Sequence, residues 1–92
     1  MKKDRTGWGA AVVAAMGQDA TALAAALPRI RVTVSARLPF EAAAMCHETL
    51  AHVEALGLRG QWGEAVRILR YLRANWREGE ARAARRRVYA PR

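Results

Sequence analysis

The sequence predicts a mostly helical α+β domain that dimerises through a single β-strand. Residues 30–38 alternate apolar and polar side chains, with β-branched residues at the centre, a pattern typical of a strand with one buried face. The rest of the chain has helical spacing and contains no second strand pattern. Because a lone strand leaves its backbone N–H and C=O groups unpaired, we expect a second copy of the chain to pair with it.

Two short helices are expected before this strand. The first covers residues 8–16 and ends at Gly17. Asp19 is a good N-cap for a second helix over residues 20–27, because its carboxylate can accept a hydrogen bond from an unpaired backbone N–H. Pro28 is expected to end that helix, since proline has no N–H and restricts the residue before it. The strand would follow directly.

A two-helix hairpin is expected after the strand. Its first helix runs from about Pro39, which suits a first turn, to Leu56, with Gly57 as its stop. Its second helix begins near Trp62, runs to about residue 77 or on to 87, and gathers apolar side chains on one face. That face consists of Ala65, Ile68, Leu69, Leu72 and Trp76. We therefore predict that Leu69 and Leu72 are buried between the two helices.

The length of 92 residues fits a single small domain, residues 1–92, with a basic C-terminal tail over about residues 78–92 that can be disordered. Only one cysteine, Cys46, is present, so an internal disulfide is excluded and a zinc site would lack ligands. A reducing, cytoplasmic location is expected. No apolar run approaches the roughly 18–20 residues of a membrane span, so no membrane partner is expected.

The chain is strongly basic, with sixteen Lys or Arg against eight Asp or Glu and a net charge of +8. Residues 67–92 contain nine arginines, including Arg67, and only two glutamates. Four of them form a stripe on the last helix, away from its apolar face: Arg67, Arg70, Arg73 and Arg77. A basic excess usually marks an anionic partner, most often nucleic acid. The alternative is an ordinary solvated surface in a chain rich in arginine and alanine.

The order of strand, helix and helix over residues 30–76 resembles the ribbon-helix-helix transcription regulators. The strand segment 31–35, the helix closing at Gly57 and the amphipathic helix through Leu69 carry this resemblance. It implies that two strands pair across a dimer and enter the DNA major groove. It also implies a phosphate contact from the backbone around residues 60–61. The base-reading side chains that it implies are Arg31, Thr33 and Ser35.

Residues 11–38 are also similar to the dimerisation half of middle-operon activators from Mu-like phages. The similarity rests on a helix, the turn at residues 17–20, a second helix and the segment 31–34. That family also pairs a strand across its dimer. Both resemblances therefore imply a homodimer through residues 30–38.

The sequence thus predicts a small dimeric DNA-binding regulator of phage, plasmid or bacterial type. The strand would read bases, whereas the arginine stripe and the basic C-terminal end would contact phosphates. The side chains expected to contact double-stranded DNA are Arg31, Thr33, Ser35, Arg37, Arg67, Arg70, Arg73, Arg77, Arg85, Arg86 and Arg87. The alternative is a non-catalytic helical module that docks on an acidic protein. It is suggested by residues 60–69, which resemble the turn and second helix of a tetratricopeptide repeat.

No enzyme activity, cofactor or metal is expected. His47 and His52 are five positions apart, about 140° around a helix, and cannot share a metal as the spacing of a zinc protease would allow. Cys46 and His47 are adjacent and do not face each other on a helix. Motifs for a serine nucleophile, a carboxylate pair or a glycine-rich phosphate loop are absent from the sequence.

Overall fold

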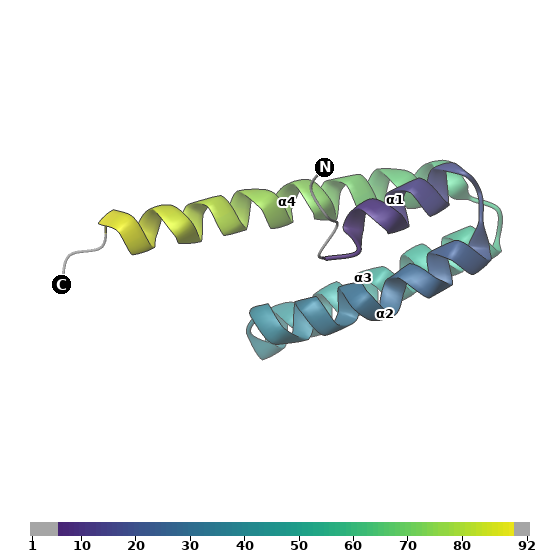
Figure 1. Ribbon diagram of the computed structural model, residues 1–92. Helices are drawn as coiled ribbons and strands as arrows, with labels where there is room; N and C mark the ends of the chain where they lie inside the picture. The colour runs from purple at the N-terminus through teal and green to yellow at the C-terminus, as the bar shows by residue number, and fades with distance from the viewer. Residues whose placement is uncertain (1–5, 90–92) are drawn as a thin grey trace.

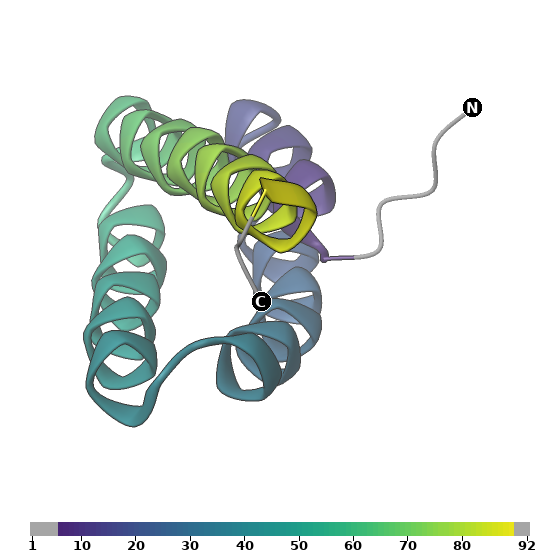
Figure 2. The same ribbon diagram turned by 90° about the vertical axis from the view of Figure 1, so that its left-hand side faces the viewer.

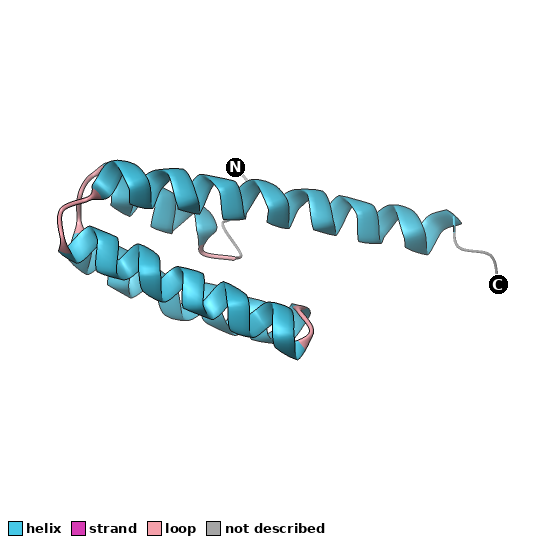
Figure 3. Ribbon diagram, turned by 180° about the vertical axis from the view of Figure 1, so that it is seen from behind, coloured by secondary structure: helices cyan, strands magenta, loops and turns pink. Residues whose placement is uncertain are grey.

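The computed structural model describes the backbone of residues 6–89 and the side chains of residues 6–76. All regular secondary structure in this part of the chain is helical (Figures 1 and 3). The helices are α1 (Trp8–Met16), α2 (Ala20–Arg37), α3 (Phe40–Leu58) and α4 (Trp62–Tyr89). The predicted α+β fold with a paired strand is therefore wrong, and the described chain forms an all-helical bundle.

The helices pack as a ring. Each helix packs against the next along the chain, and α1 also packs against α4. Figure 2 shows this arrangement from one end, with the helices around a common centre. In Figure 1, α1 and α4 form one layer and α2 and α3 form the other. The connections contain only two or three residues, and such short turns place successive helices antiparallel.

The segment that was predicted as a strand lies inside α2. Asp19 caps this helix as expected, and its carboxylate accepts a hydrogen bond from the N–H of Ala22 at 3.0 Å. The buried side chains of α2 recur at helical spacing: Leu23, Leu27, Ile30 and Val34. Val32, which a strand would place on the same face as Ile30 and Val34, is 70% exposed. Residues 30–37 are hydrogen-bonded within α2, apart from the carbonyls of its last turn, so the reason to expect a dimer through this segment disappears.

Pro28 lies in the interior of α2 instead of ending it. A proline there removes one helical hydrogen bond, to the carbonyl of Ala24, at a cost of about 3 kcal/mol. Both residues lie on the exposed side of α2, so water can bond to that carbonyl. Burial of Ile30 and Val34 beyond the proline contributes about 1.5–3 kcal/mol for each side chain. This burial outweighs the lost hydrogen bond and continues the helix.

The predicted core face of the last helix is confirmed at Ala65 and Leu69, whereas Leu72, which was predicted to be buried, is half-buried. Ala65 and Leu69 are fully buried, and Ile68, Leu72 and Trp76 pack against the buried core. Alanines of α1 and the large side chains of α2 and α3 complete this core, which includes Trp8, Ala11, Ala15, Leu50, Val53 and Leu56. Small side chains allow α1 to approach its neighbours closely.

The turn between α3 and α4 differs from its prediction. α3 does not stop at Gly57 but continues to Leu58. A Cβ atom on Gly57 would lie 2.9 Å from ring atoms of Trp62, so this glycine lets the indole pack across α3. The left-handed residue of the turn is Gly60, with φ of 79°, and the N–H of Gln61 donates to the carbonyl of Leu56 at 2.9 Å.

α4 continues well beyond the other helices (Figure 1). Residues 77–89 add about 20 Å of helix at 1.5 Å per residue. If the apolar face of α4 continued beyond Trp76 at helical spacing, its next positions would be Gly79 and Ala83, which have no large apolar side chain to bury. This extension explains a radius of gyration of 14.2 Å, against about 12 Å for a compact chain of this length. Among the described helices, none has the length and apolarity needed to cross a membrane.

Candidate functional site

The four polar residues of the predicted strand, three of which were expected to read DNA bases, do not form one row. Two residues that are two positions apart in a helix differ by about 200° around its axis, so Arg31 and Thr33 lie on different sides of α2. The Thr33 hydroxyl donates to the carbonyl of Arg29 within its own helix at 3.0 Å. Ser35 contacts α3, and Arg37 lies in the last turn of α2. The predicted base-reading ribbon is therefore wrong.

Arg31 and Ser35 instead form a polar contact with His47 that joins α2 to α3. Arg31 Nη1 lies 3.3 Å from His47 Nδ1 and donates to the His47 carbonyl at the same distance. Ser35 Oγ lies 2.9 Å from His47 Nε2. We call these three residues the α2–α3 clamp. The sequence identified Arg31 and Ser35 but did not predict their partner, because the contact depends on how two helices pack.

The clamp does not have the polarity of a serine nucleophile with its base. Arginine has only donors, so His47 Nδ1 must accept from Arg31. In the neutral imidazole, Nε2 then carries the proton and donates to the Ser35 hydroxyl. A histidine that activates a serine must accept that hydrogen bond instead. The geometry therefore supports a role in holding two helices together.

The clamp can be measured with a double-mutant cycle. We expect Ser35→Ala and His47→Ala each to lower the free energy of unfolding, since each removes a partly exposed hydrogen bond worth about 0.5–1.5 kcal/mol. The double variant should lose less than the sum of the two, by a coupling energy of about 0.5–1 kcal/mol. Urea denaturation of the four proteins measures this. Fully additive losses would contradict a hydrogen bond between the two side chains.

Cys46 lies beside the clamp but has no features of an activated nucleophile. Its side chain is half-buried, and this burial raises the pKa of the thiol. Arg31 offsets part of the effect on that pKa, because a positive charge favours the thiolate. A raised pKa lowers the thiolate fraction near neutral pH and hence the reactivity. No group of three metal-ligating side chains occurs among the residues that the structure describes.

The arginines predicted on the last helix do share a surface. Arg67, Arg70 and Arg73 follow one another at three-residue steps along α4, and we call them the arginine face. Arg67 is exposed and forms a two-oxygen ion pair with Glu64, which raises the pKa of the guanidinium. In the described part of the chain, Arg70 and Arg73 have no carboxylate partner. Two unneutralised positive charges therefore lie along this side of α4.

The remaining predicted basic residues belong to the C-terminal half of α4. Their backbone is helical, and their side chains lie outside the described residues. They are Arg77, Arg85, Arg86 and Arg87. The helix carries them beyond the bundle, as Figure 3 shows from behind. Their predicted contact with phosphate stays a prediction.

The structure also places Met16 of α1 next to the arginine face, a contact that the sequence does not predict. Arg70 Nη2 reaches to 3.5 Å from Met16 Sδ. Val13, one helical turn before Met16, is 70% exposed. Val13 and Met16 are larger apolar side chains in an Ala-rich first helix, and this was the signal for such a surface in the sequence. Which helix they would lie beside could not be read from their spacing.

No protein-family model, curated protein or solved structure matches this chain. The paired strand that both sequence resemblances imply is replaced by helix α2 in the described structure.

Proposed function

We propose that the protein is a non-catalytic helical binding module that docks on an acidic protein through the arginine face of α4. The observation that carries this proposal is the pair of exposed or partly exposed guanidinium groups, Arg70 and Arg73, without carboxylate partners among the described residues. Guanidinium groups form two-pronged hydrogen bonds with carboxylates. The single cysteine is compatible with placing this function in the reducing cytoplasm.

Two features favour a carboxylate partner over nucleic acid. Arg67 already holds a carboxylate, that of Glu64, and so demonstrates the chemistry that this surface accommodates. In addition, the residues expected to read bases lie in α2, where Arg31 and Ser35 are engaged with His47.

The proposal can be tested with a fluorescently labelled glutamate-rich peptide and a labelled DNA duplex. We expect Arg70→Gln to weaken binding of the peptide by roughly two- to fivefold at about 0.15 M ionic strength, the size of one partly screened ion pair. Arg59→Gln is the matched control, because Arg59 is an exposed arginine in the α3–α4 turn, outside the arginine face. Fluorescence anisotropy gives both affinities.

Two outcomes would overturn the proposal. Equal weakening by Arg70→Gln and Arg59→Gln would mean that net charge alone attracts the peptide. Tighter binding to the duplex than to the peptide, with the steep salt dependence of phosphate contacts, would favour nucleic acid as the partner. Binding of the peptide that depends on Arg70 and not on Arg59 supports the proposal.

A further inference from the structure

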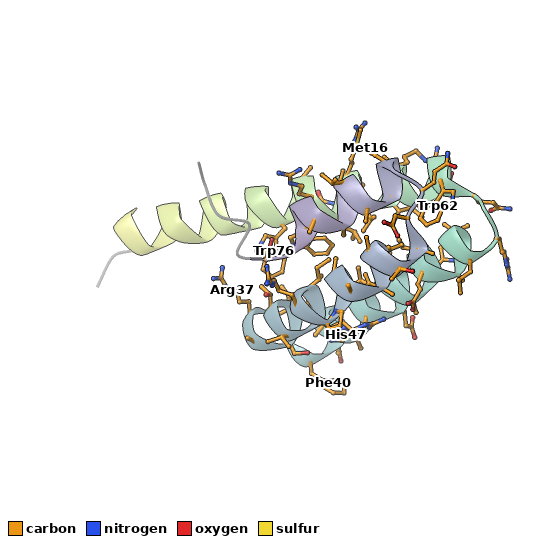
Figure 4. The ribbon with its side chains drawn as sticks, turned by 45° about the vertical axis from the view of Figure 1, so that its right-hand side comes forward. Met16, Arg37, Phe40, His47, Trp62 and Trp76 are labelled. Carbon is orange, nitrogen blue, oxygen red and sulfur yellow. The ribbon has the colours of Figure 1, made fainter. Side chains whose placement is uncertain are left out.

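The arginine face has an apolar border supplied by α1. Met16 is 57% exposed and Val13 is 70% exposed, although both belong to a helix whose other apolar side chains are mostly buried. Arg70 lies against the sulfur of Met16, so these two side chains form one continuous surface, and Val13 lies one helical turn before Met16 on α1. We call Val13, Met16 and the arginine face together the mixed patch. Figure 4 shows Met16 on the outer side of the α1–α4 layer, far from His47.

We infer that the mixed patch binds an acidic amphipathic helix of a partner protein. Apolar side chains of that helix would contact Val13 and Met16, while its carboxylates would pair with Arg70 and Arg73. This inference rests on the proposed function and names the kind of segment that the surface accepts. A purely acidic segment would leave Val13 and Met16 in water, and a purely apolar one would leave two guanidinium groups without carboxylates.

The spacing of the groups fits a helical occupant. The arginines advance along α4 by about 4.5 Å for each three-residue step. Acidic residues three or four positions apart on a partner helix advance by about 4.5–6 Å and can follow the same line. Residues at such spacing share one helix face, beside which an apolar stripe can lie. Methionine is unbranched and flexible, so Met16 can adapt to the side chain that it meets.

A second copy of this chain fits the mixed patch poorly. Each copy carries a net charge of +8, so two arginine faces would repel each other. DNA would gain little from Val13 and Met16, because its outer surface is a phosphate backbone. The combination of apolar and basic groups therefore favours an acidic amphipathic segment of another protein.

Two synthetic peptides of equal charge test this inference. Both contain glutamates at helical spacing, and one has a leucine stripe that is replaced by serine in the other. We expect the leucine peptide to bind about five- to tenfold more tightly, since it buries apolar surface on α1. This difference should persist at high ionic strength, because burial of apolar surface is not screened by salt.

Protein variants locate the contact. Met16→Ser should weaken binding of the leucine peptide to about the level of the serine peptide and leave the serine peptide unaffected. Val32→Ser is the matched control, because Val32 is 70% exposed on the outer side of α2, away from the mixed patch. Both substitutions lie at exposed positions, so circular dichroism should show unchanged helix content.

The possible results separate this inference from the function on which it rests. If the two peptides bind equally and Arg70→Gln still weakens both, the amphipathic occupant is wrong and the acidic partner stands. If neither peptide binds, both proposals fail. Equal effects of Met16→Ser and Val32→Ser would also overturn the assignment of the contact to α1.

Discussion

Val34→Asp is expected to unfold the protein, whereas Val32→Asp is expected to change its stability by no more than about 0.5 kcal/mol. Val34 is fully buried in the bundle, and Val32 is 70% exposed. A carboxylate at position 34 would lie among apolar side chains without a partner, a cost of several kcal/mol. Small domains have about 5–15 kcal/mol of total stability, so this one change removes most or all of it.

Circular dichroism and urea denaturation of the two variants provide the measurement. Both substitutions introduce the same side chain into the same helix, so differences in helix propensity largely cancel. If residues 30–38 formed a strand, Val32 and Val34 would share a face and the two variants would lose similar stability. Similar losses would therefore contradict α2 as described here.

The misassigned strand shows why periodicity alone could not decide this segment. Ile30 and Val34 are four positions apart, a separation that keeps two residues on the same face of either a strand or a helix. Val32 and Ala36 distinguish the two, because a strand would place them on the same face as Ile30 and Val34, and both are exposed in α2. Pro28 added to the error, because proline normally ends a helix. The helix continues through Pro28 because two side chains before it and two after it are buried in the core. That burial depends on α1 and α3 being in place.

Other elements were predictable because their signals are local. Asp19 caps α2 through its own carboxylate, and the core face of α4 follows from apolar residues that repeat over several turns. The alignment of Arg67, Arg70 and Arg73 follows from the same helical period. The contacts of His47 with α2 and of Met16 with Arg70 join residues far apart in the chain. Such contacts depend on tertiary packing, which no local pattern encodes.

The contact between Trp8 and Trp76 marks where the packed bundle ends and the extension of α4 begins. Their ring centroids are 6.2 Å apart and the rings are tilted by 50°. The indole N–H groups of both are buried and find no acceptor among the described residues, which costs about 1–3 kcal/mol for each unsatisfied donor. Burial of two large rings offsets this cost. Beyond Trp76, the next positions on the core side of α4 are Gly79 and Ala83, which supply no comparable side chain.

Leu69→Ala is expected to lower the free energy of unfolding by about 2–5 kcal/mol. Leu69 is fully buried where α4 meets the core, and this core contains many alanines, which are too small to refill the space. The loss therefore combines the transfer of the missing methyl groups with the cost of a residual cavity. Tyr71→Ala is the control on the same helix, because Tyr71 is 67% exposed, and it should cost no more than about 0.5 kcal/mol.

Urea denaturation of both variants measures the difference. A loss below about 0.5 kcal/mol for Leu69→Ala, no larger than an ordinary surface change, would mean that α4 turns a different face to the core. That result would also rotate Arg67, Arg70 and Arg73 away from Met16, because one helical period positions both sets of side chains. A large loss at Leu69 together with a small one at Tyr71 supports the helix orientation on which the arginine face depends.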